Sequence, residues 1–173
     1  MDLNVLRQLP VLSDFSEGEL IDLFANATER RFLPGSFLCK EGDQDGNLYF
    51  LLTGEIEVSK KDADGHAHTL ASLGNGALLG ELSWILGIPC TANLKAVKET
   101  SVVLLNGTAL AEQLQERSPS AFKLNVALLR LLAGRLMRMN NQFLESQTKP
   151  NGNGHKKSEI ERLRERILHD WSF

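Results

Sequence analysis

The sequence predicts a mixed α+β fold, mainly β, in which an antiparallel β-roll or jelly roll has a helix before it and a long helix after it. Between residues 36 and 105, short runs rich in Phe, Leu, Tyr, Ile and Val alternate with turns that contain glycine. Many short strands at close spacing favour a roll over a parallel sheet. On both sides of this segment a helix-start signal precedes apolar residues at helical spacing, which indicates flanking helices.

Composition limits the class of protein. The chain has 173 residues, of which 42% are apolar and 24% charged, as is typical of one globular domain with an arm or tail. It contains no run of 18 apolar residues. Its first residues lack the basic stretch followed by an apolar stretch that is typical of a secretory signal. We therefore expect no membrane association and a cytoplasmic location. Residues 1–117 carry 9 Lys/Arg against 17 Asp/Glu, and this acidic balance disfavours a nucleic-acid partner.

An N-terminal helix is predicted over residues 16–28. Ser16 and Glu19 have the spacing of a capping box, in which each side chain accepts a hydrogen bond from a free backbone N–H at the helix start. The apolar residues that follow at helical spacing are Leu20, Leu23 and Phe24.

Six strands are predicted from the alternating apolar runs. They lie near residues 36–40, 48–53, 55–60, 67–73, 92–97 and 101–105. Asp64-Gly65 between two such runs is a strong hairpin signal, because both residues of that turn need positive φ. The segment 74–86 interrupts the strands, and Gly80 followed by Glu81 predicts a short helix there.

A long helix is predicted from residue 118 to about 147. Ser118 is suited to the N-cap, and Pro119 to the first helical position, where no N–H is needed. Seven residues at alternating steps of four and three form a heptad seam: Phe122, Val126, Leu129, Ala133, Leu136, Asn140 and Phe143. The seam predicts a homodimer, and the alternative is a monomer whose helix covers the roll.

The C-terminal residues predict a linker and a tail. Pro150 and the Asn/Gly run after it indicate a flexible linker over residues 148–157, which follows a domain over residues 1–147. A short amphipathic helix is predicted over residues 158–173, with one apolar face formed by Ile160, Leu163, Ile167 and Trp171. This tail is too short for a helix-turn-helix reader of DNA. Two roles stay open for it: docking on its own domain, or binding a groove of a partner protein.

The segment from Leu78 to Ala96 carries the functional expectation. A glycine that opens a helical turn, here Gly80, exposes free backbone N–H groups whose dipoles favour an anion. The next residue, Glu81, can accept hydrogen bonds from sugar hydroxyls, and a buried arginine further along would complete a phosphate site. The alternative for Glu81 is a helix-start carboxylate that these N–H groups stabilise without any ligand.

Four segments of the chain resemble the cyclic nucleotide-binding domain family, which includes the effector domain of the bacterial catabolite activator protein. They are Glu29–Asp43, Leu48–Val58, Leu73–Leu82 and Leu124–Leu144, within a resemblance that covers about residues 5–145. The first two look like the opening strands and hairpin, the third like the entry to the phosphate-binding cassette, and the fourth like the family's C-helix. The resemblance implies a β-roll, cyclic AMP or cyclic GMP as candidate ligand, and parallel dimerisation through the long helix.

The resemblance assigns cassette roles residue by residue. Gly80 matches the cassette glycine, and Glu81 matches the glutamate that binds the ribose 2′-hydroxyl. Leu82 and Ser83 would supply backbone N–H groups to the phosphate.

The family's phosphate arginine is missing from this sequence. In the family it follows a proline in the pattern P-R-x-A, whereas here Pro89 is followed by Cys90, Thr91 and Ala92. A thiol brings no positive charge, and each charge-assisted bond is worth about 1.5–3 kcal/mol, so cyclic nucleotide affinity should fall by about two powers of ten. Thr91 keeps a hydroxyl that can hold a phosphate oxygen.

Three interpretations of the function stay open. We expect a non-enzymatic regulatory protein that acts through a protein partner, with weak or absent cyclic nucleotide binding. The alternatives are a cyclic nucleotide sensor that gates partner binding by moving the C-helix, and a pocket for another ligand. Candidate substitutes for the missing charge are Lys95, Arg130, Arg135 and Arg138. The sequence contains no nucleophile–base pair, metal-ligand spacing or Walker-type loop, so we expect neither enzyme activity nor a metal.

The cysteines and two histidines are weaker candidates. Cys39 and Cys90 lie far apart in the sequence, so we expect two buried reduced thiols, with a disulfide or redox pair as the alternative. His66 and His68 flank a hairpin turn, where we expect exposed turn residues, with half a metal site as the alternative.

Overall fold

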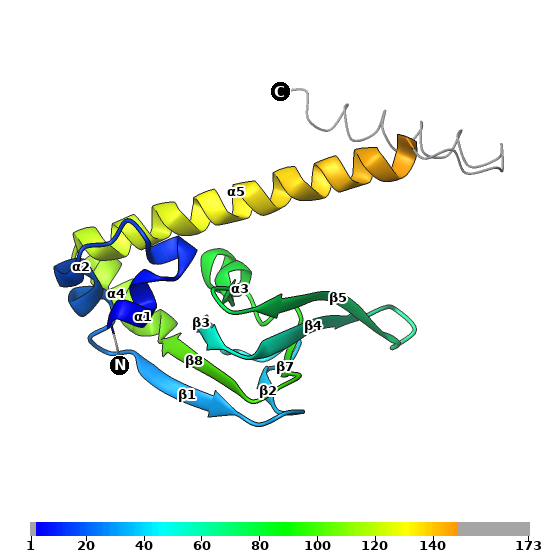
Figure 1. Cartoon of the computed structure of the whole chain (residues 1–173), viewed down its shortest axis with the longest axis horizontal. Coiled ribbons are helices and arrows are strands. Elements are labelled where there is room, and N and C mark those ends of the chain that lie inside the picture. Colours follow the sequence, from blue (N-terminus) through cyan, green and yellow to red (C-terminus); the bar gives the residue numbers. More distant parts are fainter. Residues whose placement is uncertain (1–2, 149–173) are drawn as a thin grey trace. The chain divides into compact units, whose positions relative to one another are not determined.

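The computed structural model describes residues 3–148, which form two four-stranded antiparallel sheets and several helices (Figure 1). The helices are α1 (Leu3–Arg7), the 3-10 helix η1 (Pro10–Leu12), α2 (Glu17–Leu23), α3 (Glu81–Leu86), α4 (Gly107–Gln115) and α5 (Pro119–Thr148). The strands are β1 (Thr28–Phe32), β2 (Phe37–Cys39), β3 (Leu48–Thr53), β4 (Glu55–Lys61), β5 (Ala67–Gly74), β6 (Leu78–Leu79), β7 (Asn93–Ala96) and β8 (Thr100–Leu105). The predicted fold class is confirmed.

The chain divides into two units at Leu132, within α5. The first unit contains both sheets, the shorter helices and α5 as far as Leu132. Of the second unit, the structure describes residues 133–148, which continue α5. Among residues 3–148, no helix combines the length and apolar character that a bilayer crossing requires. Apart from Thr148, the predicted linker over 148–157 and the tail helix over 158–173 lie outside the described residues.

The strand order makes the cassette segment the connection from one sheet to the other. One sheet has the order β1-β8-β3-β6, and the other has the order β2-β7-β4-β5. Successive side chains of the central strand β3 point to opposite faces of the sheet, and those of both faces are buried. Leu48 and Phe50 enter a core that the helices cover, whereas Tyr49 and Leu51 enter a second core between the sheets. Since β6 pairs with β3 and β7 lies between β2 and β4, the segment between β6 and β7 connects the two sheets.

The helix-covered core holds the first unit's helices against the first sheet. Leucines from α1, α2, α4 and the start of α5 meet the apolar face of β3, β6 and β8 there: Leu6, Leu20, Leu23, Leu110, Leu124 and Leu128. Phe24 packs edge-to-face on Phe50, with ring centroids 5.1 Å apart. Figure 1 shows α1, α2 and α4 gathered beside the first turns of α5.

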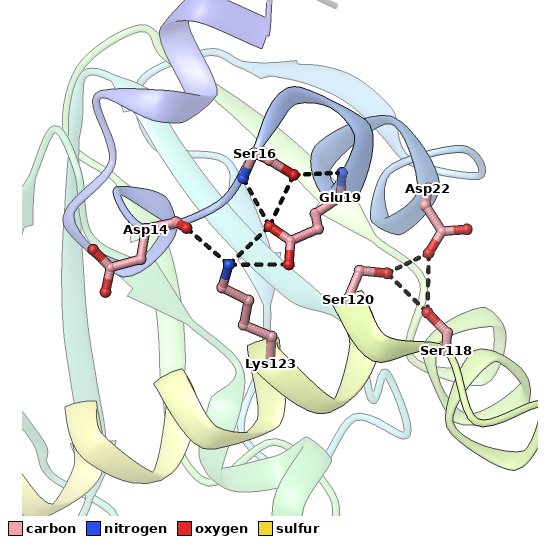
Figure 2. A network of polar contacts seen from close by, with 7 residues as sticks. All are labelled: Asp14, Ser16, Glu19, Asp22, Ser118, Ser120 and Lys123. Atoms are coloured by element: carbon pink, nitrogen blue, oxygen red, sulfur yellow. Dashed lines mark hydrogen bonds and ion pairs between the residues drawn. The ribbon is translucent and has the colours of Figure 1, made fainter.

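Lys123 of α5 joins this helix to α2 through a compact ion-pair cluster (Figure 2). Its ammonium Nζ lies 2.8 and 3.0 Å from the two Glu19 carboxylate oxygens and donates to the Asp14 carbonyl at 2.8 Å. It also lies 4.8 Å from the centre of the Phe15 ring. The same Glu19 carboxylate accepts from the Ser16 backbone N–H at 2.8 Å, so the predicted capping box is confirmed. The Lys123 hydrogen bond and the Ser16 backbone N–H lower the pKa of Glu19 to about 2.

Asp22 forms the second half of the same contact (Figure 2). Its Oδ2 atom accepts from the Ser118 hydroxyl at 3.0 Å and from the Ser120 hydroxyl, and the latter side chain is buried. Ser118 Oγ also accepts from the Ala121 N–H at 3.3 Å, which confirms its predicted N-cap role. The "α2–α5 junction" denotes these contacts of Asp22 together with those of Lys123.

The structure corrects several predicted element boundaries. The predicted helix over 16–28 is wrong at its C-terminal end, because α2 ends at Leu23 and Thr28 already pairs with Leu104 in the first sheet. The predicted strands over 36–40 and 92–97 shorten to β2 and β7. Apolar patterning did not indicate α1, β6 or α4. The helix α4 begins at a glycine, although glycine is a weak helix former.

Candidate functional site

Gly80 is the N-cap of α3, directly after β6, and only glycine fits there. Its φ of 86° and ψ of −5° lie in the left-handed region, which strains residues that have a side chain. A Cβ added at this position would also collide with the carbonyl oxygen of Asn47. The predicted short helix after Gly80 is confirmed, and it spans Glu81–Leu86.

The first turn of α3 carries the predicted ribose and phosphate residues. Glu81 is 4% exposed and Ser83 is 5% exposed, whereas Leu82 is 42% exposed. The Ser83 hydroxyl donates to the Pro89 carbonyl at 3.3 Å, so this side chain holds the loop that leads to the expected arginine position. The roles of Leu82 and Ser83 backbone N–H groups toward a phosphate stay predictions.

Trp84 connects α3 to α4. Its backbone N–H donates to the Gly80 carbonyl at 3.1 Å, and its indole Nε1 donates to the Gly107 carbonyl at 3.2 Å. Gly107 in turn lies so close to the Gly46 carbonyl and the Trp84 ring that a Cβ could not be accommodated. This contact fixes the cassette helix against the first residue of α4.

Cys90, at the arginine position of the family pattern, is buried and held by backbone hydrogen bonds. Its carbonyl accepts from Gly42 N at 2.8 Å, and its N–H donates to the Asp43 carbonyl at 2.8 Å. These two bonds fix residue 90 opposite the loop between β2 and β3. Thr91 next to it is half-buried.

The fold brings the two cysteines together beside a carboxylate. Sγ of Cys39 at the end of β2, Sγ of Cys90 and a carboxylate oxygen of Asp45 all lie within 4.8 Å of one another. We call these three residues the thiol–carboxylate cluster. Both cysteines are 5% exposed, so the predicted burial is confirmed. The expectation of two buried reduced thiols did not include their proximity, which arises because antiparallel pairing of β2 with β7 joins segments that are remote in sequence.

Burial raises the pKa of both thiols in the cluster. For Cys39 the contact with Cys90 and the negative charges of Asp45 and Asp43 raise the pKa further. For Cys90 the same two carboxylates also raise the pKa, and the hydrogen bond with Cys39 partly offsets this. Both side chains are therefore neutral thiols at neutral pH. The position where the family pattern has a guanidinium thus holds an uncharged group beside a carboxylate.

Asp45 is oriented by two neighbours. Its Oδ1 atom accepts from the Asn47 amide Nδ2 at 2.6 Å, and its Oδ2 atom accepts from the Tyr49 hydroxyl. Asn47 Oδ1 accepts from the Gly107 N–H at 3.3 Å, which connects this group to α4. Sequence reasoning missed Asp45, Asn47 and Tyr49, since Asp45-Gly46-Asn47 looks only like a turn.

Lys95 does not share the environment of the thiols. Along β7, Leu94 and Ala96 are buried in the core between the sheets, which also contains Cys39 and Cys90, so the alternate residue Lys95 points to the opposite face. Its Nζ lies 6.0 Å from the centre of the Phe37 ring. Of the other candidate substitutes, Arg130 is exposed on α5, and the roles of Arg135 and Arg138 stay predictions.

His66 and His68 lie at the β4–β5 hairpin and are exposed. Asp62 accepts from the His66 backbone N–H at 2.9 Å and from the Asp64 backbone N–H at 3.0 Å, and His68 Nε2 lies 2.6 Å from its other oxygen. The His68 contact and these backbone bonds lower the pKa of Asp62. The predicted exposed turn residues are confirmed, and their hydrogen bonds close the hairpin.

A profile of the family described as cyclic nucleotide-binding domain matches residues 29–117. The chain belongs to this family. A crystal structure of a cyclic nucleotide-binding domain from Methylobacillus flagellatus is similar to it with a TM-score of 0.72 and 29% identity, covering 88% of this chain and 84% of that one. The match to residues 29–117 begins at the second residue of β1 and contains β2 to β8, the cassette and α4.

Two curated relatives are much longer than this chain. A CRP-like cAMP-activated global transcriptional regulator of Mycobacterium tuberculosis is 28% identical over 114 residues, which are 66% of this chain and 49% of the regulator. A cyclic nucleotide-gated channel of Caenorhabditis elegans is 34% identical over 129 residues, which are 70% of this chain and 17% of the channel. The chain therefore spans about half of the regulator and less than a fifth of the channel.

Proposed function

We propose that this cyclic nucleotide-binding domain is a non-enzymatic regulatory module that acts through a protein partner and binds cyclic nucleotides weakly or not at all. The observation that carries the proposal is the thiol–carboxylate cluster at the arginine position of the cassette. The relatives are named as a transcriptional regulator and a channel, which supports a regulatory role for the domain.

Charge is the physical reason for weak binding. A cyclic phosphate is an anion, and the family pattern pairs it with a guanidinium through charge-assisted bonds worth about 1.5–3 kcal/mol each. Here Cys90 is a buried neutral thiol, and the carboxylate of Asp45 lies within 4.8 Å of its sulfur. The phosphate would lose an attraction and meet a like charge, so affinity should be at least about two powers of ten lower than with an arginine.

A cyclic nucleotide sensor is the second candidate. Gly80 keeps the left-handed conformation that opens α3, and Glu81 keeps the position of the ribose-binding glutamate. If the pocket is otherwise formed, a cyclic nucleotide would still bind through the ribose and the backbone N–H groups of α3.

Calorimetry with cyclic AMP and cyclic GMP separates these two functions. We expect no heat of binding at micromolar concentrations for the parent chain. Cys90→Arg should raise the affinity by about 100-fold, because it restores the missing charge. The matched control Cys90→Ala removes the thiol without adding charge and should leave the affinity unchanged. Micromolar binding by the parent chain that Glu81→Ala abolishes would replace the proposal with the sensor.

The proposed homodimer uses the heptad seam of α5. In the first unit, Phe122, Val126 and Leu129 are 51%, 46% and 57% exposed. In the second unit, Leu136 and Phe143 on the same repeat are 47% and 46% exposed. Apolar residues of this size at heptad spacing favour association with another helix.

Sedimentation velocity tests the dimer. Leu136→Glu should shift the chain from dimer to monomer, because it places a charge in the apolar seam. Met137→Glu is the matched control, since Met137 is 67% exposed and lies outside the seam. Equal sedimentation of the parent and Leu136→Glu would remove the homodimer from the proposal.

A further inference from the structure

The thiol–carboxylate cluster has the composition of a metal site. Two sulfur donors and one carboxylate oxygen come from β2, the loop after it and the segment between α3 and β7. Thiolates select soft or borderline cations, whereas Mg²⁺ and Ca²⁺ need a shell of oxygen ligands. We propose that Cys39, Asp45 and Cys90 bind a thiophilic divalent cation of the Zn²⁺ class. The inference does not rest on the proposed function.

The donor spacing fits tetrahedral zinc. Zn–S bonds of about 2.3 Å and Zn–O bonds of about 2.0–2.2 Å place tetrahedral donors about 3.5–3.8 Å apart. The three donor atoms of the cluster already lie within 4.8 Å of one another. Tetrahedral coordination would therefore require each pair of donors to approach by at most about 1.3 Å. Three protein ligands leave the fourth position for water or another small ligand.

The backbone around the cluster is fixed. Paired hydrogen bonds of 2.8 Å tie Cys90 to Gly42 and Asp43, and Cys39 lies at the end of β2, where it pairs with Leu94 of β7. Backbone hydrogen bonds therefore hold both ligand-bearing segments, so that binding would require little ordering of the chain.

The carboxylate has the supporting contacts that metal ligands usually have. Asn47 donates to Oδ1 of Asp45 and Tyr49 donates to Oδ2, so each oxygen is oriented by one neighbour and keeps a further lone pair for a metal. Loss of such a supporting group typically lowers metal affinity about 10- to 100-fold. Tyr49 is therefore expected to tune this site without touching the cation.

The charge of the cluster favours a cation over the anion that the family pattern receives. Asp45 lies against both sulfur atoms, and Asp43 is in the same loop. A divalent cation would bind as the two thiols lose their protons to solvent, would offset this negative charge, and would link residues 39–45 to Cys90. Because it would bind the folded chain and not the unfolded one, it should also raise the melting temperature.

The test is a Co²⁺ titration of the full chain, reduced and freed of metal with a chelator that is then removed. We expect one Co²⁺ per chain, with the thiolate-to-cobalt charge-transfer absorption and the intense visible bands of a tetrahedral site, and displacement by one Zn²⁺. Cys39→Ser, Cys90→Ser and Asp45→Asn should each lower the affinity at least tenfold, and Tyr49→Phe should lower it about 10- to 100-fold.

Asp43→Asn is the matched control. It neutralises a carboxylate in the same loop but keeps an oxygen for the Lys40 N–H, which it now accepts at 2.9 Å. Because Asp43 contributes charge but no donor atom to the cluster, its replacement should lower the affinity by less than about threefold, well below the tenfold or more expected for the ligand variants. Melting curves without metal identify any cysteine variant that fails to fold, and Asp45→Asn gives an independent variant at a half-buried site.

Three results would overturn the inference. The first is the lack of thiolate-to-cobalt absorption in a folded chain that titrates with two free thiols. The second is unchanged affinity in a folded Cys90→Ser or Asp45→Asn variant. The third is a Cys39–Cys90 disulfide that persists in the reduced preparation. None of these results touches the proposed function, because nucleotide calorimetry on the metal-free chain tests that separately.

Discussion

The α2–α5 junction and the thiol–carboxylate cluster differ in the partners that they give to a carboxylate. At the junction, the Lys123 ammonium lies within 3.0 Å of both oxygens of the Glu19 carboxylate. In the cluster, the Asp45 carboxylate faces two thiols whose pKa values burial raises. The first carboxylate has a cationic partner within the chain, whereas Asp45 is held by the neutral donors Asn47 and Tyr49 and would gain a counter-charge only from the cation that we propose. The chain therefore has the fold of its family, and a neutral thiol stands where the family pattern has an arginine.

The junction also bears on how the sensor alternative would work. Ser118, Ser120 and Lys123 tie the first turns of α5 to α2. Any movement of α5 must therefore either carry α2 with it or bend the helix beyond Lys123. A cyclic nucleotide response would have to supply enough differential binding energy to do one of these.

Substitution of Gly80 gives the largest expected effect and tests whether the cassette turn is as constrained as the junction. Gly80→Ala should destabilise the fold by about 3–5 kcal/mol, because left-handed strain adds to overpacking against the Asn47 carbonyl. Gly35→Ala is the matched control, since Gly35 has the same φ of 86° but nothing within 4 Å of the added Cβ. We expect about 1–2 kcal/mol there. Equal melting temperatures for the two variants would show that the backbone around Gly80 accommodates a side chain at little cost in stability.

Several helix starts could be predicted from local sequence signals, whereas the thiol–carboxylate cluster could not. The capping box of Ser16 and the N-cap of Ser118 are local, since the partner groups lie three residues away. The end of α2 depends on a remote part of the chain, because Thr28 pairs with Leu104 in the first sheet. In the same way α4 begins at a glycine only because the Gly46 carbonyl and Trp84 approach it so closely.

The candidate site divides along the same line. The turn at Gly80 and the missing arginine at Cys90 follow from adjacent residues and from the family pattern. The partners of Cys90 do not, because Cys39 and Asp45 reach it through antiparallel pairing and through the loop after β2. A search for metal-ligand spacing finds cysteines that are close in sequence, so it does not detect donor atoms that the fold brings together from two remote segments.

Removal of one buried hydroxyl tests the Asp22 half of the junction, and we expect a moderate effect. Ser120→Ala should lower the free energy of unfolding by about 1 kcal/mol, because Ser120 is 2% exposed and donates to Asp22. The matched control is Ser13→Ala, whose hydroxyl donates to the Pro10 carbonyl at 3.0 Å on the exposed surface. It should change stability by less than about 0.5 kcal/mol. Urea denaturation of both variants measures the difference, and equal midpoints would mean that this half of the junction contributes little.

The smallest expected effect is the pH dependence of the Lys123–Glu19 pair, which is partly exposed and therefore screened. The folded chain holds the pKa of Glu19 at about 2, below its ordinary value of 4.5. A carboxylate with a lowered pKa stabilises the fold fully above the ordinary value, and this contribution is lost as the pH falls from about 4.5 toward 2. Melting temperatures over that range should therefore fall less steeply for Lys123→Met than for the parent. Lys61→Met, the same substitution on exposed β4, should retain the parent slope. If Lys123→Met keeps the parent slope as well, the ion pair of the junction orients the two helices without stabilising the fold.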